Sequence, residues 1–428
     1  MHPQIESQLG VDEVTMAAKI WSRSFWLKSR RAFTCLAVFG ILVYARQWVV
    51  VRVDGIQGSR EMIKVIQGHT TRSQYPRGQI LLDQMLTGHW VPRKYTVQEM
   101  GELEAFNKRV WTFYKIPHTL QREDKKCGNV SFPGLAWFRG LCDPKGATPC
   151  CMNNSCVNRS VQECQCPDCY DVRPQIYAEF ATWLPDDTTV KLTKFTTEKD
   201  ACRVLQNKTV YFIGDSFMRQ LYTSVLAMLR DAKPRHVIRD NVPLANVTNC
   251  DKYYRFVADC RNYLIWSTKE CNGTTNLSMK SIYKAQNSDG PLKSIRELNG
   301  TVNSWLVVGL GAHDYYNITA VRQHMIDPLL NILKNSTWPK LIWMASHSPG
   351  LLKTGTEKRQ QSQALLDYND QLTAILNARG IPILKFFDFT KGVFSFDGAH
   401  YGSIFAINFL TSALEPVFLK SSTYIYFR

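Results

Sequence analysis

The second half of the sequence predicts an α/β domain. From about residue 202, apolar strand-like runs alternate with amphipathic helix-like runs, which is the texture that an α/β domain requires. An apolar content of 45% with 12% aromatic residues is sufficient for a sizeable core. A length of 428 residues allows one large domain with appendages or two ordinary domains.

The elements of this domain follow from hydrophobic periodicity. Residues 217–230 read as a helix because Leu221, Val225 and Leu229 recur at every fourth position. Pro416 is expected to end the last helix. We expect strands at Thr209–Ile213, Trp305–Val308, Leu341–Ala345 and Ile383–Phe387, and helices at Phe217–Arg230, Ser362–Ala378 and Ala406–Leu414.

The N-terminal region predicts a membrane anchor. Ala32–Ala45 is an uncharged apolar run that continues, after Arg46 and Gln47, to Val51. A span needs about 20 apolar residues, so the segment qualifies if Arg46 snorkels to the interface. A cleaved signal peptide is the alternative, but roughly 30 polar residues precede the run and no small-residue cleavage site follows it.

The charges beside this run predict its orientation. Lys28, Arg30 and Arg31 lie on its N-terminal side, which indicates a cytosolic tail (1–31), an anchor (32–51) and a lumenal body. The short span suits a thin early-secretory membrane. We therefore expect a single-pass type II protein of the Golgi or another secretory-pathway membrane.

N-glycosylation sequons support a lumenal body, because all of them follow the apolar run and sequons on surface loops are modified in the secretory path. They begin at Asn129, Asn153, Asn158, Asn207, Asn246, Asn272, Asn276, Asn299, Asn317 and Asn335.

Cysteine usage points the same way. Of 13 cysteines, Cys35 lies in the apolar run, and the other twelve form an even set that predicts disulfides in an oxidising compartment. Zinc is the alternative for the cluster between Cys150 and Cys169, but no histidine lies within it and its spacings do not make two CxxC pairs. The sequence does not determine which cysteines pair with one another.

Two further segments precede the α/β domain (201–428). The juxtamembrane region (52–115) contains a helical pattern at Glu99–Tyr114, and 116–200 is cysteine-rich and loop-heavy. The formal net charge of +16 would favour an anionic partner or reflect a generic basic surface. Nucleic acid is excluded as a partner by the expected compartment.

The strongest local motif is Gly214-Asp215-Ser216. It lies between the strand 209–213 and the helix 217–230, so the serine is expected in a sharp turn at a helix N-terminus. Backbone N–H groups and the positive end of the helix dipole would then face an oxyanion at the site. Gly214 permits the tight turn. Asp215 is expected to anchor the turn by hydrogen bonds.

A serine nucleophile needs a base and an orienting acid. Asp397 and His400, three residues apart near the end of the same α/β unit, supply both. The spacing lets one turn present the imidazole to Ser216 while Asp397 addresses the other ring nitrogen. We therefore predict a catalytic triad of Ser216, His400 and Asp397.

These motifs carry a family resemblance. The segments IGDSFMRQLY and FDGAHYG resemble the SGNH hydrolases and, more narrowly, the PC-esterase branch, in which Arg219 of GDSxxR is typical. That branch includes plant trichome birefringence-like polysaccharide O-acetyltransferases and animal sialic-acid O-acetyltransferases. The resemblance covers about 200–428, with weaker echoes at Gly88–Val91 and in the cysteine-rich segment. It implies a flavodoxin-like three-layer α/β/α fold.

The resemblance also implies an oxyanion hole made of the Ser216 N–H, a glycine and an asparagine. The glycine has no convincing counterpart between 217 and 304. After strand 305–308, Gly311 and His313 stand where the asparagine turn is expected, and His313 would replace the asparagine as donor. Arg219 would position substrate or a loop, or form a structural ion pair.

Three functions remain open at this stage. The first is an O-acyltransferase that O-acetylates glycan hydroxyls in the Golgi lumen through a Ser216 acyl-enzyme. The second is a lumenal carbohydrate or lipid esterase with the same triad, and the third is an inactive glycan-binding glycoprotein. No bound cofactor or metal is expected. The acyl donor would be acetyl-CoA or an acetylated carrier, provided by a separate supplier or a lumenal pool, and the glycan acceptor would be neutral or anionic.

Overall fold

The computed structural model describes residues 77–190, 192, 197–230, 234–251, 255–353 and 362–401. The predicted cytosolic tail, the anchor (32–51) and the closing helix (406–414) lie outside the described residues. Within the described ranges, no helix has both the length and the apolar character needed to cross a membrane. The described residues belong to one compact unit.

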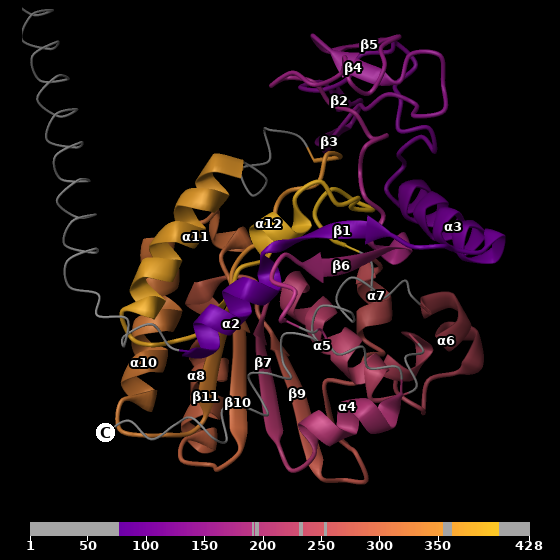
Figure 1. The fold of residues 1–428 in the computed structure, drawn as a ribbon. Coiled ribbons are helices and arrows are strands. Elements are labelled where there is room, and N and C mark those ends of the chain that lie inside the picture. The colour runs from indigo at the N-terminus through magenta and orange to yellow at the C-terminus, as the bar shows by residue number, and fades with distance from the viewer. Residues whose placement is uncertain are drawn as a thin grey trace, which may run out of the picture. The chain divides into compact units, whose positions relative to one another are not determined.

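A six-stranded sheet forms the centre of this unit (Figure 1). Its strand order is β12-β11-β10-β7-β9-β8, and every pair is parallel except β8 with β9. The strands are β7 (Thr209–Gly214), β8 (Ser267–Glu270), β9 (Thr275–Ser281), β10 (Ser304–Gly309), β11 (Lys340–Met344) and β12 (Ile383–Leu384).

The parallel strands have the flavodoxin-like order. Taken in chain order, β7, β9, β10, β11 and β12 lie across the sheet as 2-1-3-4-5. The chain first moves outward from β7 to β9 and then returns to place β10 on the other side of β7. The switch point therefore lies between the carboxyl ends of β7 and β10, where open α/β sheets bind their ligands.

Helices cover both faces of the sheet and make three layers. On one face, Leu82, Val204 and Leu221 pack with strand residues such as Phe212. On the other face, Ile295, Leu329 and Leu372 pack with strand residues such as Val308. The first layer contains α2 (Arg77–Leu86), α4 (Glu198–Leu205) and α5 (Ser216–Met228), and the second contains α8 (Asp289–Leu298), α10 (Asp327–Leu333) and α11 (Ser362–Asn377). The mixed α/β fold expected from the sequence is thus confirmed.

Shorter elements connect these layers. They are α6 (Leu244–Cys250), α7 (Ala258–Arg261), α9 (Ile318–Val321), the π-helical turn Arg322–Ile326, and the 3₁₀ turns Ala178–Phe180, Pro234–Val237, Ala285–Asn287 and Ala312–Asp314.

Elements from both ends of the region before residue 201 pack on the α/β domain. The buried Gln79 side chain in α2 donates to the Ile383 carbonyl at 2.9 Å and accepts from the Ile383 N–H at 2.6 Å, so it satisfies the backbone of the edge strand β12. The strands β1 (Gly88–Pro92) and β6 (Ala181–Pro185) form an antiparallel pair, and their Trp90 and Trp183 rings contact each other and Phe389.

The expected helix at Glu99–Tyr114 is α3 (Val97–Phe113). A capping box between Thr96 and Glu99 starts it. Phe106 packs edge-on against Phe396, and the Trp111 indole N–H donates to the Phe396 carbonyl at 3.0 Å. This helix is therefore in direct contact with the segment that carries Asp397 and His400.

One expected strand is too long. The prediction of a strand at Ile383–Phe387 is wrong after Leu384, because the chain turns at Lys385 into α12 (Phe386–Thr390). In a helix, Phe386 and Phe389 share one face, and both are buried in the layer that contains Trp183. Tertiary packing of these two rings outweighs the strand preference of the apolar run.

The cysteine-rich segment folds around small hairpins and disulfides. Its strands are β2 (Ser131–Phe132), β3 (Leu135–Arg139), β4 (Cys150–Met152) and β5 (Ser155–Val157). The disulfide prediction is confirmed, because the twelve cysteines pair as Cys127–Cys151, Cys142–Cys156, Cys150–Cys164, Cys166–Cys169, Cys202–Cys271 and Cys250–Cys260. The two groups of three cysteines with metal-compatible spacing consist of these bonded sulfurs, which are not thiolates.

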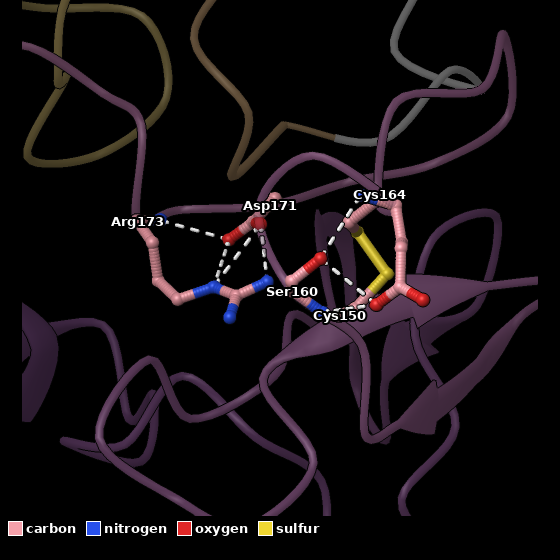
Figure 2. Close-up of polar contacts among 6 residues, drawn as sticks. Cys150, Ser160, Cys164, Asp171 and Arg173 are labelled. Carbon is pink, nitrogen blue, oxygen red and sulfur yellow. Dashed lines mark hydrogen bonds and ion pairs between the residues drawn. A yellow bond between two sulfur atoms is a disulfide. The ribbon is translucent and has the colours of Figure 1, made fainter.

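Local hydrogen bonds hold the loop that reaches Cys150 (Figure 2). The Glu163 carboxylate accepts from both the N–H and the hydroxyl of Ser160 at 2.8 Å, and the Cys164 N–H donates to the Ser160 carbonyl at 3.1 Å. These bonds close the turn that brings Cys164 to Cys150. Nearby, the Asp171 carboxylate accepts several hydrogen bonds from Arg173, which raise the pKa of that guanidinium.

The sequon asparagines lie on the surface. Nine of the ten are exposed, and Asn246 is half-buried. A glycan needs an accessible amide, so the fold leaves the predicted sites available without testing whether they are modified.

Candidate active site

The nucleophile turn has the form expected from the sequence. Strand β7 ends at Gly214, and α5 begins at Ser216. Asp215 caps the helix, because its carboxylate accepts from the Phe217 N–H at 2.9 Å. Ser216 thus occupies the first helical position, where backbone N–H groups have no partner within the helix.

Ser216, His400 and Asp397 form a continuous hydrogen-bonded chain. The Ser216 hydroxyl lies 2.7 Å from His400 Nε2, and His400 Nδ1 lies 2.8 Å from Asp397 Oδ2. These are the two contacts that a serine nucleophile, its base and its orienting acid require. The structure therefore brings together the three residues predicted as a triad, although Ser216 and His400 are 184 positions apart.

Asp397 is held as a carboxylate. Its second oxygen accepts from the backbone N–H groups of Ala399 at 3.0 Å and His400 at 2.8 Å. Burial by itself would raise the pKa of Asp397, but the attraction and hydrogen bonds of His400 and the charge of Lys353 outweigh it and hold that pKa well below its usual value. A permanently ionised Asp397 fixes the imidazole with its Nδ1 proton directed at the acid and Nε2 directed at Ser216.

The pKa of Asp215 is shifted in the opposite direction from that of Asp397. Its side chain is buried, and burial raises its pKa to about 6 despite the Phe217 hydrogen bond and the attraction of His400 and Arg219. Its hydrogen bond from the Phe217 N–H makes it the cap of α5. The structure places it as the sequence predicted.

Arg219 lies one helical turn after Ser216 and is buried, with 2% of its surface exposed. Burial, with the nearby charge of Arg261, lowers its pKa to about 10. Its Nε and Nη2 atoms have no hydrogen-bond partner among the described residues. The nearby charge of Asp215 acts in the opposite direction and favours the charged guanidinium.

The turn after β10 contains Gly311, His313 and Asp314. Gly311 has φ +132°, and a Cβ there would lie 2.7 Å from the Tyr368 ring. The Tyr368 hydroxyl donates to the Leu310 carbonyl at 2.7 Å, and the Asp314 carboxylate accepts from the Ala285 N–H at 3.1 Å. The turn is thus fixed on both sides.

His313 packs edge-on against Tyr283, with ring centroids 5.0 Å apart. Tyr283 therefore contacts one of the residues named from the sequence. No motif singled it out, because it follows β9 without any conspicuous pattern. The register between β9 and β7 places it just beyond the carboxyl end of β7.

His347 is a second residue whose position the sequence did not establish. It follows β11 and is half-buried, with its ring 4.7 Å from Phe217 and 5.0 Å from Phe386. Burial, with the nearby His400, lowers its pKa to about 3. The His347 and His400 rings both pack on Phe217, so a neutral His347 adds no charge near the catalytic imidazole.

The cysteine-rich segment contacts the loop that precedes Lys353, close to the candidate active site. Arg139 in β3 donates its backbone N–H to the Leu352 carbonyl at 2.9 Å and its Nε to the Lys353 carbonyl at 2.7 Å. The same loop is tied to the triad segment, because the Gly350 N–H donates to the Gly398 carbonyl at 3.0 Å. The segment thus supports the loop on which Asp397 rests.

Comparisons with known proteins found similar chains only among solved structures. No family model matches the sequence, and no curated protein matches it. Among solved structures, the chain is similar to a member of the lipolytic protein G-D-S-L family from Veillonella parvula DSM 2008, with 14% identity and a TM-score of 0.28 over 50% of this chain and 98% of that chain. It is also similar to the native aryl esterase of M. smegmatis, with 10% identity and a TM-score of 0.27 over 49% of this chain and 98% of that chain.

TM-scores this low do not establish a shared fold. The assignment of the fold rests on the strand order and the two helical layers, and the candidate active site rests on its own geometry.

Proposed function

We propose that this protein is a serine-dependent acyl-transfer enzyme that works through a covalent Ser216 acyl-enzyme. The observation that carries the proposal is the hydrogen-bonded chain from the Ser216 hydroxyl through His400 to Asp397 at the carboxyl edge of the sheet. An inactive binding protein would have no need to keep a buried, ionised Asp397 behind this imidazole.

The first half-reaction uses these groups in order. Ser216 Oγ attacks the carbonyl carbon of an acyl donor while its proton passes to His400 Nε2, and the carbonyl electrons move onto the oxygen. When the tetrahedral intermediate collapses, the bond to the leaving group breaks and His400 returns the proton to that group. Asp397 stabilises the imidazolium in between and keeps its own charge.

In the second half-reaction, an acceptor hydroxyl attacks the acyl-enzyme and gives its proton to His400. The bond between the acyl carbon and Ser216 Oγ then breaks, and His400 returns that proton to Ser216. If the acceptor is water the enzyme is an esterase, and if it is a sugar hydroxyl the enzyme is a transferase. The same side chains serve both reactions.

The finer proposal is that the acyl group is acetyl and the acceptor is a glycan hydroxyl in the lumen of the Golgi. Support comes from the GDSxxR form with Arg219, from the resemblance to O-acetyltransferases that it carries, and from six disulfides and the accessible sequons, which suit a secretory compartment. The excess of basic residues favours an anionic glycan. The acetyl group would come from acetyl-CoA or an acetylated carrier.

One assay tests the proposal. Full-length protein, purified in detergent, is incubated with a labelled acetyl donor, with and without candidate glycans, and acetylated sugar and free acetate are measured separately. We expect acetylated sugar with the wild type and neither product with Ser216→Ala. Free acetate alone would favour the esterase, and activity equal to wild type in Ser216→Ala would overturn the triad.

A further inference from the structure

Two disulfides of the cysteine-rich segment lie side by side. The Sγ atoms of Cys150, Cys164 and Cys169 are all within 4.8 Å of one another. Cys150 and Cys164 are bonded to each other, whereas Cys169 is bonded to Cys166. One sulfur of the second disulfide is therefore a close neighbour of both sulfurs of the first.

The backbone holds Cys169 near Cys150. The Cys151 N–H donates to the Tyr170 carbonyl at 3.1 Å, and the Tyr170 N–H donates to the Cys151 carbonyl at 3.0 Å. Cys150 directly precedes Cys151, and Cys169 directly precedes Tyr170. The closeness of the two sulfurs therefore follows from paired backbone segments as well as from the side chains.

Cys166–Cys169 is the more accessible of the two disulfides. Both of its cysteines are half-buried, whereas Cys150 is 0% and Cys164 is 5% exposed. Exposed disulfides are the ones that thiols exchange with most readily, because a thiolate must reach one of the two sulfurs. A thiol from solvent therefore meets Cys166–Cys169 first.

We infer that these four cysteines form a thiol–disulfide exchange site, which takes a small thiol of the glutathione class at Cys166. The incoming thiolate bonds to Cys166 Sγ, the Cys166–Cys169 bond breaks, and Cys169 leaves as a thiolate. Cys169 Sγ then bonds to Cys150 Sγ. The Cys150–Cys164 bond breaks, and Cys164 Sγ takes the electron pair and a proton from water. Two disulfides and one thiol are present before and after, so no oxidant or reductant is consumed.

Cys164 is the leaving sulfur because its turn is held by its own hydrogen bonds. Figure 2 shows the Cys150–Cys164 bond beside Ser160, at the end of this turn. The Ser160 hydroxyl donates to the Glu163 carboxylate at 2.8 Å, and the Cys164 N–H donates to the Ser160 carbonyl at 3.1 Å. These bonds persist when the disulfide breaks. Cys150, by contrast, lies in β4 and stays beside Cys169.

The exchange site lies next to contacts that hold the loop 350–353. Tyr170 follows Cys169, and the Arg139 guanidinium lies over the Tyr170 ring, 4.0 Å from its centroid. Arg139 also donates to the carbonyls of Leu352 and Lys353. A change of partner at Cys169 therefore occurs one residue from the ring on which Arg139 rests.

Two single variants of the full-length protein isolate the second step. Cys166→Ser leaves Cys169 as a thiol beside the buried disulfide. Cys169→Ser is the matched control, because it leaves Cys166, whose sulfur does not belong to the group of three. Both variants lose the same disulfide, which closes only a short loop and contributes little to stability.

Thiols in both variants are labelled with N-ethylmaleimide in denaturant at mildly acidic pH, where exchange slows because little thiolate is present. Fragmentation of the peptides in a mass spectrometer then locates each label. We expect label on Cys164 and a Cys150–Cys169 bond in Cys166→Ser, and label on Cys166 alone in Cys169→Ser. Label confined to Cys169 in the first variant, or present on Cys164 in the second, would overturn the proposal.

The wild type tests the first step. The protein is incubated with reduced glutathione, quenched with acid and mapped in the same way. We expect glutathione bonded to Cys166 and N-ethylmaleimide on Cys164. Glutathione on Cys166 with label on Cys169 would refute the exchange, and a protein that keeps all six native disulfides would refute the entry of the thiol at Cys166.

Discussion

Gly214 and Gly309 face each other at the ends of neighbouring parallel strands, and the Gly309 carbonyl oxygen lies 2.1 Å from where a Cβ of Gly214 would stand. Met218, one turn into α5, would lie 2.4 Å from the same atom. Gly214 also has φ +153°, a value that L side chains rarely adopt. The nucleophile turn can therefore close against β10 only with a glycine at this position.

Gly214→Ala is expected to destabilise the fold by at least about 3 kcal/mol, because the backbone carbonyl of Gly309 cannot move aside without breaking the sheet. Gly290→Ala in α8 is the matched control. Its Cβ would meet only the end of the Lys280 side chain at 3.8 Å, and alanine favours a helix by up to about 1 kcal/mol over glycine. Thermal unfolding checks both variants, and a Gly214→Ala protein with the wild-type midpoint would contradict this account of the turn.

Asp397→Asn is expected to lower kcat by about 10³- to 10⁴-fold while leaving the fold intact. The amide is similar in shape but has no charge to stabilise the imidazolium, and it can turn the imidazole toward the wrong tautomer. Asp388→Asn, at an exposed carboxylate in α12, is the control and should retain activity. Ester hydrolysis or acetyl transfer by the two variants is the measurement, and equal losses would refute the assignment of Asp397.

Asp215→Asn is expected to stabilise the protein at neutral pH. The pKa of Asp215 is about 6 in the folded state and 3.8 in the unfolded reference, so the folded state binds more protons between these values. Stability contributed by the protonated acid is complete below pH 3.8 and is lost as pH rises to 6. Asparagine caps a helix as well as aspartate but does not ionise.

The variant should therefore match the wild type near pH 4 and exceed it above pH 6, by on the order of 3 kcal/mol in the free energy of unfolding. Urea titrations at several pH values, with the disulfides intact, measure the difference. A gap between the two proteins that does not change with pH would show that the burial of this carboxyl is not what shifts its pKa.

The disulfides are expected to differ in their contribution to stability. Cys202–Cys271 joins residues 69 positions apart, whereas Cys166–Cys169 spans only 3. In the chain-entropy model, closing the longer loop contributes about 4 kcal/mol and the short loop much less. Replacing each pair with serine and comparing unfolding free energies tests this, and a larger loss for the short loop would contradict it.

The local elements of the α/β domain could be predicted because each depends on its own residues. The buried run at 209–213 and the four-residue periodicity from Leu221 to Leu229 encode β7 and α5 directly. The oxidised state of the twelve cysteines followed from their even number, but not their pairing, since many pairings satisfy the same count. The end of β12 was misplaced because the packing of Phe386 and Phe389, rather than strand preference, ends the strand there.

The sequence by itself determined the chemistry of the candidate site: a serine in a strand-to-helix turn, with an acid and a histidine three residues apart. These motifs are short, and the chemistry of each side chain indicates its role. Only the tertiary structure decided what lies around them. Strand pairing brings the end of β9 beside the end of β7, and His400 reaches Ser216 across 184 positions only in the folded chain. Strand register and burial are properties of the whole sheet, so no local stretch of sequence contains them.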